Sequence, residues 1–289
     1  MPYRTAFVLF FALSMAVTAF PVLARMLVER GLQRSRLGVL ALTSASLSDV
    51  LVWGLLVGVV ALANPAGTSP WRLVLLVPYV ALLLAVRPLL RHLVRPTSGR
   101  PPKDRFVLLF VGMLVSAGIT EFLGLHFIFG AFIFGALVPR DAKGTLHADL
   151  VRQATRLGGL LLPIYFVIAG LQVDLSGFGV TGLLTLALIL LVAIGGKLGG
   201  GYLGARAARL DHRTALAVGA LMNTRGLTEL VILTIGLQLG FLDGPLYTLL
   251  VVMAVVTTAM TGPLLSALKV TDRTHPPIDA FLPVSANRS

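Results

Sequence analysis

The chain has 289 residues, a net charge of +12 and no cysteine; 56% of its residues are hydrophobic and only 12% are charged. Soluble domains are about 45–50% apolar and about 25% charged, so this composition excludes a soluble fold, and its ample apolar surface excludes a disordered chain. The lack of cysteine excludes disulfides, zinc–thiolate sites and cysteine nucleophiles. We therefore predict an all-α integral membrane protein that resides in a lipid bilayer.

Nine apolar segments follow one another along the chain, at residues 5–24, 37–63, 71–90, 106–125, 127–138, 157–173, 180–205, 214–239 and 245–268. Most are close to the ~20 residues that cross the bilayer core as a helix. The fifth segment is too short to span the membrane alone. Residues 270–289 are polar and contain Pro276 and Pro277, which predicts a disordered cytoplasmic tail after a transmembrane exchanger domain that covers 1–269.

The basic residues are distributed asymmetrically between these segments. Most of the 24 Lys and Arg residues lie in alternate gaps, whereas the gaps at 64–70, 174–179 and 240–244 carry none. By the positive-inside rule, this predicts a multi-pass protein, of a bacterial plasma membrane, with a cytoplasmic C-terminus and an outside N-terminus. An outside start suggests a chain shortened at its N-terminus. Because the basic residues lie in short loops, we expect no nucleic acid as a partner.

Deep in the predicted spans lie four charged side chains, those of Asp49, Lys197, Arg225 and Glu229. A charge at such a position is costly and usually has a function. Asp49 lies near the middle of the second segment and follows Ser46 and Ser48, with Ser46 on the same helix face. These oxygens suit a proton or a monovalent cation, although a structural carboxylate paired with a lysine is the alternative. Lys197, in a glycine-rich part of the seventh segment, is expected to pair with Asp49.

Other functions fit the sequence less well. The glycines at 199–204 match the pattern GxGxxG, but they follow no strand and lie in an apolar span, so they favour close helix packing over nucleotide binding. An intramembrane aspartyl protease needs two deep aspartates, and a metalloprotease needs HExxH, which the sequence lacks. We expect neither an enzyme nor a cofactor, and no metal besides a transported cation.

The first segment contains an interruption. Proline removes a backbone donor and clashes with the preceding turn, so Pro21 predicts a break near Thr18. The eighth segment is interrupted as well, and it runs through the membrane in the opposite direction. The first and eighth segments, each with the segment that follows it, therefore look like matching parts of an inverted repeat. Two broken helices in corresponding positions are the best sequence indication of a transporter's binding site.

The second break is predicted from small and polar residues in mid-span, namely Asn223, Thr224 and Gly226. Arg225 and Glu229 are four residues apart and can face each other on one helix face. They either neutralise each other and support the break, or they contact the ion; buried pairs often only satisfy each other.

Five stretches, in order, resemble the monovalent cation:proton antiporter-2 family, which includes the Kef-type and plant cation/proton exchangers. They are TAFPVLARML (18–27), ASLSDVLVW (45–53), GAFIFGALV (130–138), LLPIYFVIAGLQVDL (161–175) and ALMNTRGLTELVILTIGLQLG (220–240). The resemblance extends to about Lys269. It implies the sodium/proton-antiporter fold with crossed broken helices, a moving core domain that exchanges Na⁺ or K⁺ for H⁺ by alternating access, and dimer contacts that would make a homodimer.

The resemblance also implies roles for individual residues. Asp49 matches the family's ion-binding aspartate and Lys197 the basic residue that pairs with it. The first break is matched by Thr18 and Pro21, and the second by Asn223, Thr224, Arg225, Gly226 and Glu229.

Three departures from the family pattern accompany these matches. Ser48 stands where the family usually has Asp or Asn, which puts the charge stoichiometry in question. The family's first helices and the cytoplasmic nucleotide-binding domain of Kef-type members are not expected here. The alternative function is therefore a truncated, inactive or channel-like membrane protein of the same fold.

Overall fold

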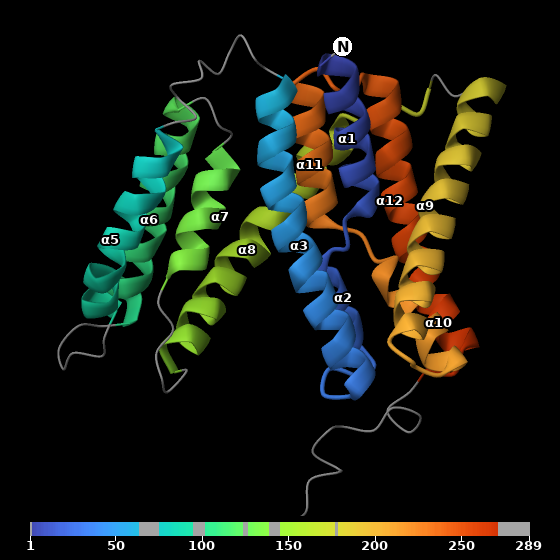
Figure 1. The fold of residues 1–289 in the computed structure, drawn as a ribbon, viewed down its shortest axis with the longest axis horizontal. Helices are drawn as coiled ribbons and strands as arrows, with labels where there is room; N and C mark the ends of the chain where they lie inside the picture. Colours follow the sequence, from blue (N-terminus) through green and yellow to red (C-terminus); the bar gives the residue numbers. More distant parts are fainter. Residues whose placement is uncertain are drawn as a thin grey trace, which may run out of the picture. The chain divides into compact units, whose positions relative to one another are not determined.

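The computed structural model describes residues 2–63, 75–94, 102–123, 127–138, 145–176 and 179–270. Every regular element in these ranges is a helix, which confirms the all-α prediction. The helices (Figure 1) are α1 (Pro2–Ala16), α2 (Phe20–Glu29), α3 (Arg36–Ala63), α5 (Leu76–Val94), α6 (Pro102–Phe122), α7 (Phe127–Leu137), α8 (Thr145–Leu171), α9 (Val180–Ala207), α10 (His212–Met222), α11 (Leu227–Gln238) and α12 (Gly244–Ala267).

The helices agree with a multi-pass membrane protein. Within the described ranges, six helical stretches are long and apolar enough to cross a membrane: Arg4–Glu29, Arg36–Val60, Arg105–Phe122, Arg152–Leu171, Val180–Ala207 and Gly244–Ala267. The pair α10 and α11, bent by 44°, adds a seventh if it is one broken span. Shorter apolar helices at Val77–Pro88 and Phe127–Leu137 correspond to the third and fifth predicted segments. The predicted tail after residue 270 lies outside the described residues.

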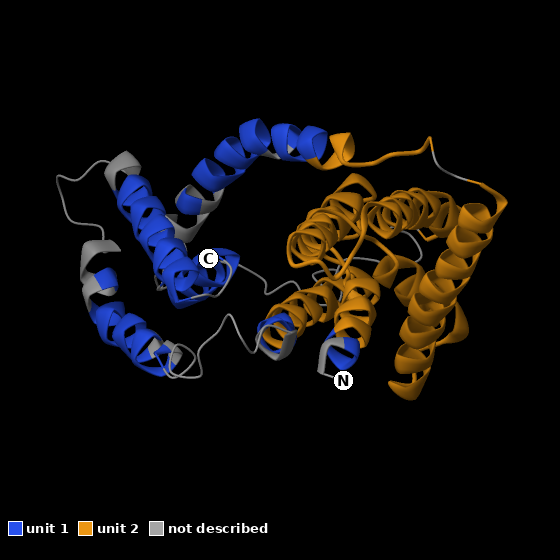
Figure 2. Ribbon diagram, turned by 90° about the horizontal axis from the view of Figure 1, so that it is seen from above, with its two compact units in different colours: residues 1–6, 56–168 blue, residues 7–55, 169–289 orange. Residues whose placement is uncertain are grey.

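The chain divides into two compact units (Figure 2). The first combines Met1–Ala6 with Leu56–Ile168, and the second combines Phe7–Leu55 with Ala169–Ser289. In the first unit, the hydroxyls of Tyr79 and Ser116 lie 2.5 Å apart, and Ser116 donates to the Gly130 carbonyl at 2.6 Å. A Cβ on Gly130 would lie only 2.2 Å from the Ser116 carbonyl oxygen, so a glycine is required where α7 approaches α6.

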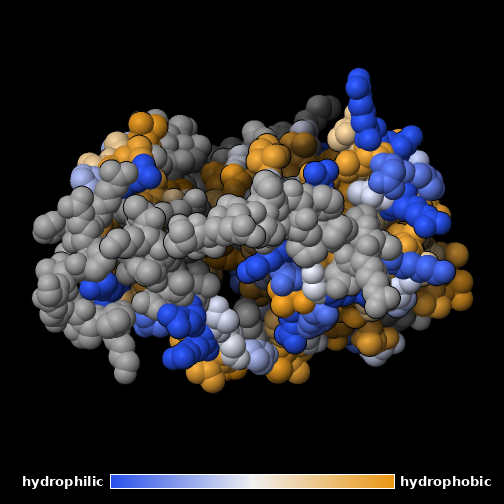
Figure 3. Space-filling view, turned by 90° about the horizontal axis from the view of Figure 1, so that it is seen from below, coloured by the Kyte–Doolittle hydropathy of each residue, from blue (hydrophilic) through white to orange (hydrophobic). Residues whose placement is uncertain are grey.

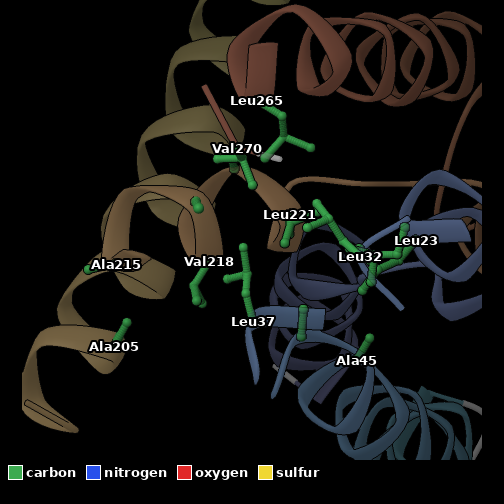
Figure 4. Close-up of a cluster of buried hydrophobic side chains, with 14 residues drawn as sticks. Leu23, Leu32, Leu37, Ala45, Ala205, Ala215, Val218, Leu221, Leu265 and Val270 are labelled. Atoms are coloured by element: carbon green, nitrogen blue, oxygen red, sulfur yellow. The ribbon is translucent and has the colours of Figure 1, made fainter. Parts of the chain in front are cut away.

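In the second unit, α9 and α10 pack against each other through glycines. A Cβ on Gly201 would lie 2.8 Å from the Cα of Gly219, which confirms the predicted close approach of the glycine-rich part of α9 to a neighbouring helix. Beside this contact lies a buried hydrophobic core (Figure 4) of Leu23, Leu27, Leu32, Leu37, Ala41, Ala45, Ala205, Ala215, Ala217, Val218, Ala220, Leu221, Leu265 and Val270.

The surface of the second unit has an apolar helix and a charged end. Leucines 184, 188 and 191 of α9 are 62–71% exposed, which fits a helix face in contact with lipid. The end of the unit where α2 stops and α10 begins carries hydrophilic atoms in the view from below (Figure 3). Arg206, Arg209 and Arg213 are exposed there, where the sequence predicts the cytoplasmic side.

A candidate ion site at two broken helices

The first break lies between α1 and α2. Residues 17–19 are not helical, and α2 begins at Phe20 with Pro21 in its first turn. A proline is tolerated there, because the first amides of a helix have no intrahelical partner. The prediction of a break near Thr18 is confirmed, and Pro21, which is exposed, starts the second half-helix rather than kinking a continuous one.

The second break lies between α10 and α11. α10 ends at Met222 and α11 begins at Leu227, which confirms the break predicted at 223–226. The amide of Thr224 and its hydroxyl both donate to the Leu221 carbonyl, at 3.2 and 2.8 Å. This local turn replaces some of the helical hydrogen bonds that the break removes; in a membrane the remaining backbone groups need other partners.

The two breaks cross and hold each other. The Ala19 amide donates to the Thr224 carbonyl at 3.0 Å, and the Thr18 hydroxyl donates to the Met222 carbonyl at 2.9 Å. At the crossing, a Cβ on Gly226 would lie 2.5 Å from a methyl group of Val22. The interruptions therefore form one site in the second unit, and the glycine permits their close approach.

Arg225 connects the second break to the end of α1. Its Nη1 donates to the Ser14 carbonyl at 3.2 Å, and its Nη2 donates to the Met15 carbonyl at 2.9 Å. Nη1 also lies 2.6 Å from Oε1 of Glu229, and both side chains of this ion pair are 0% exposed. The last carbonyls of a helix lack amide partners and carry partial negative charge, so a cation is favourable there. The predicted facing of Arg225 and Glu229 is confirmed.

Lys197 provides a second cation at the same helix end. Its ammonium group donates to the carbonyl of Ala16 and to the hydroxyl of Thr18, the latter at 2.6 Å. The expected direct ion pair with Asp49 is not present between these two described residues. The lysine instead binds the terminal carbonyl of α1 and the hydroxyl of Thr18.

Asp49 lies on α3 and is half-buried, opposite the start of α2. Its Oδ1 is buried and has no hydrogen-bond partner among the residues that the structure describes. The carboxylate lies near the backbone of Phe20, the first residue of α2, whose N-terminus has no side-chain cap. A helix N-terminus carries partial positive charge, so this position favours a carboxylate. The site thus contains a negative group that is positioned by a half-helix but not fixed by an ion pair.

The two serines before Asp49 differ in position. Ser48 lines a cavity of about 680 Å³, chiefly between α1 and α9, which Thr18 and Lys197 also line. Ser46 is exposed, and its hydroxyl donates to the Leu42 carbonyl of its own helix at 2.8 Å. The structure therefore brings Ser48 to the candidate site but not Ser46, because the hydroxyl of Ser46 is already used within α3.

Sequence reasoning did not identify Thr258 of α12. Its hydroxyl accepts from the Arg225 amide at 2.9 Å and donates to the Arg225 carbonyl at 3.0 Å. The adjacent threonines at 257 and 258 in an apolar span were an available signal. In the first unit, Glu121 accepts a hydrogen bond from the first amide of α7, that of Phe127, at 2.9 Å.

Residues 1–270 match the model of a protein family described as the transmembrane sodium/hydrogen exchanger. The chain belongs to this family. It is 38% identical over 273 residues to the Na⁺/H⁺ antiporter NhaS4 of Synechocystis sp.. This alignment covers 91% of this chain and 66% of the relative. It is 35% identical over 282 residues to K⁺/H⁺ antiporter 1 of Saccharomyces cerevisiae, covering 90% of this chain and 31% of the relative.

A plant relative gives the same result. The chain is 35% identical over 285 residues to cation/H⁺ antiporter 20 of Arabidopsis thaliana, covering 92% of this chain and 33% of the relative. The chain thus spans from 31% to 66% of the length of these three relatives. The match confirms the family resemblance inferred from the sequence, and this is a family of transporters rather than enzymes.

Proposed function

We propose that the protein exchanges a monovalent cation, Na⁺ or K⁺, for H⁺ across the membrane by alternating access. The observation that carries this proposal is the Asp49 carboxylate, whose buried Oδ1 has no hydrogen-bond partner beside two crossed broken helices. An ionisable group at such a position is by default a functional candidate. The relatives named as Na⁺/H⁺, K⁺/H⁺ and cation/H⁺ antiporters support the same reaction class.

Asp49 is proposed to take the cation and the proton in turn. A bare carboxylate is unfavourable in a medium of low dielectric constant, so either a proton or a metal ion stabilises it. Both bind the same oxygens, and each must leave before the other binds, which couples their movement. The hydroxyls of Ser48 and Thr18 are further oxygen ligands for the cation on this proposal, since both line the cavity that contains the Lys197 side chain.

Lys197 is proposed to act as the charge partner. When Asp49 is empty and ionised, the two side chains together carry no net charge, which lowers the cost of moving the core through the membrane. The Thr18 hydroxyl, which binds Lys197 here, would have to be released for a cation to bind it. Lys197 and the transported cation would then compete for the same oxygen.

Several finer assignments belong to the same proposal. The exposed arginines where α9 ends and α10 begins support a cytoplasmic position for this connection and, by alternation of the spans, for the C-terminus. A homodimer and a bacterial plasma membrane stay predictions from the sequence. Antibody access to a C-terminal tag in intact and permeabilised cells would test the orientation.

The decisive experiment measures proton movement in sealed vesicles that contain the purified protein, after pulses of Na⁺ or K⁺. The unmodified protein should release protons on a pulse, and Asp49→Asn should abolish the response because the neutral amide binds neither ion. Asp174→Asn is the matched control, since this carboxylate lies between α8 and α9 and accepts only from Ser176. Exchange retained by Asp49→Asn would contradict the assignment, whereas cation flux without proton movement would favour the channel-like alternative.

A further inference from the structure

The unwound segment between α10 and α11 leaves backbone groups without their usual partners. In a continuous helix the Arg225 amide would bond to the Leu221 carbonyl, but Thr224 already uses that carbonyl through both its amide and its hydroxyl. In a membrane, an unsatisfied backbone group is costly because no water replaces the lost partner. The conformation of the break therefore depends on side chains from other helices.

A single side chain of α12 satisfies both backbone groups of Arg225. The Thr258 hydroxyl accepts from the amide at 2.9 Å and donates to the carbonyl at 3.0 Å. A hydroxyl oxygen can accept one hydrogen bond and donate another through the same atom, and threonine provides this in a small, uncharged side chain. One turn of α12 thus fixes the backbone of the residue whose side chain binds α1.

The same turn of α12 holds the break at a second point. The Asn223 side-chain amide donates to the Thr257 carbonyl at 3.2 Å. The two contacts lie on either side of Thr224, whose carbonyl receives the amide of Ala19 from the first break. Movement of α12 would therefore be transmitted to the crossing, and from there to Thr18 and Lys197.

We propose that Thr258 is a positioning residue of the exchange reaction: its hydroxyl holds the unwound backbone of Arg225, so that the crossing keeps Thr18 in place for the ion. This inference rests on the proposed function of Asp49. Thr258 does not touch the ion on this proposal. Loss of the Thr258 hydroxyl should therefore weaken cation binding at the crossing, while the Asp49 carboxylate that binds the ion stays present.

The test compares Thr258→Val with Thr257→Val, its neighbour on α12. Thr257 is a close match because its hydroxyl donates only to Met253 and Ala254, within its own helix. In the vesicle assay, Thr258→Val should raise the KM for the cation by about five-fold or more. About five-fold is the low end of the effect expected when buried polar groups lose their hydrogen-bond partners. Thr257→Val and Thr258→Ser should stay close to the unmodified protein. Equal KM values for the two valine variants would overturn the proposal.

A second measurement does not depend on transport. Hydrogen–deuterium exchange of the peptide that contains the break should speed up in Thr258→Val, because the Arg225 amide loses its acceptor, and it should not change in Thr257→Val. An unchanged rate of hydrogen–deuterium exchange in Thr258→Val would overturn this inference. An unmodified protein that moves no cations in the vesicle assay would overturn the proposed function of Asp49 instead. If both Thr258→Val and Thr258→Ala fail to fold while Thr257→Val folds, the hydroxyl serves the fold and the proposal is rejected.

Discussion

Each of the two broken helices has an acidic side chain near the start of its second half, but only one of these side chains is held by an ion pair. At the second break, Glu229 in the first turn of α11 is paired with Arg225 at 2.6 Å, and neither side chain is exposed. At the first break, the acidic group facing the start of α2 comes from another helix. It is Asp49, which is half-buried and forms no direct ion pair with any residue that the structure describes.

This difference indicates which carboxylate can exchange its partner. Glu229 also has one oxygen, Oε2, without a hydrogen-bond partner, but its other oxygen is fixed by Arg225. Arg225 is itself fixed by the end of α1 and by Thr258. A cation that displaced Arg225 would disrupt three elements, whereas one that bound Asp49 would displace no direct partner. We therefore propose that the second break serves as a scaffold for the first.

The largest expected effect comes from breaking the buried pair. Glu229→Gln should lower the free energy of unfolding by about 3–5 kcal/mol, because it leaves the Arg225 charge buried without an opposite charge. The exposed pair of Arg25 and Glu29 is the control, since it has the same i, i+4 spacing and is 82% and 63% exposed. Glu29→Gln should cost about 0.5 kcal/mol or less. Equilibrium unfolding in mixed micelles would measure both, and equal losses would contradict the scaffold role.

A smaller effect is expected where the two breaks touch. In Gly226→Ala the new Cβ would lie 2.5 Å from a Val22 methyl group and 3.3 Å from the Ala19 Cβ. Overpacking of this kind costs about 1–3 kcal/mol, and Val22→Ala in the same chain should recover part of the loss. Gly195→Ala, at a glycine of α9 with open space around it, should not lose stability. Thermal unfolding in detergent would measure the three variants, and additive losses in the double variant would exclude the clash.

The smallest effect concerns the start of α10. Hydrogen bonds from the side chain and then the amide of Thr214 lower the pKa of Asp211, which caps this helix, from its ordinary value of 3.8. Because the folded-state pKa is lowered, the stabilisation is present above the ordinary pKa and is lost as the pH falls through the folded value. Asp211→Ala should cost about 0.5 kcal/mol at neutral pH, the low end for an N-cap.

This loss should shrink when the pH falls below the ordinary pKa of Asp211, since the parent then loses the same contact. Asp211→Asn is the control, because asparagine is also a good N-cap but does not titrate. Thermal unfolding at a series of pH values would check the trend. A loss that stays constant down to acidic pH would show that the charge of Asp211 does not contribute.

Much of the site could be predicted from particular residues. Pro21 marked the first break and Gly226 the second, because each disturbs a helix in a way that local geometry decides. Lys197 was expected to pair with Asp49, but its ammonium group binds the Ala16 carbonyl and the Thr18 hydroxyl instead, because position along two helices does not decide which way their side chains face. The serines 46 and 48 show the same limit, because periodicity alone could not tell which hydroxyl would be used within α3.

The sequence by itself determined that this is an all-helical membrane protein with two interrupted spans and with acidic residues inside its apolar segments. These properties follow from composition and local backbone chemistry. Only the tertiary structure decided that Lys197 and Arg225 both bind the end of α1, and that Thr258 holds the second break. Those contacts join residues up to about two hundred positions apart, and they form because a half-helix end buried in the membrane needs partners that its own segment cannot supply.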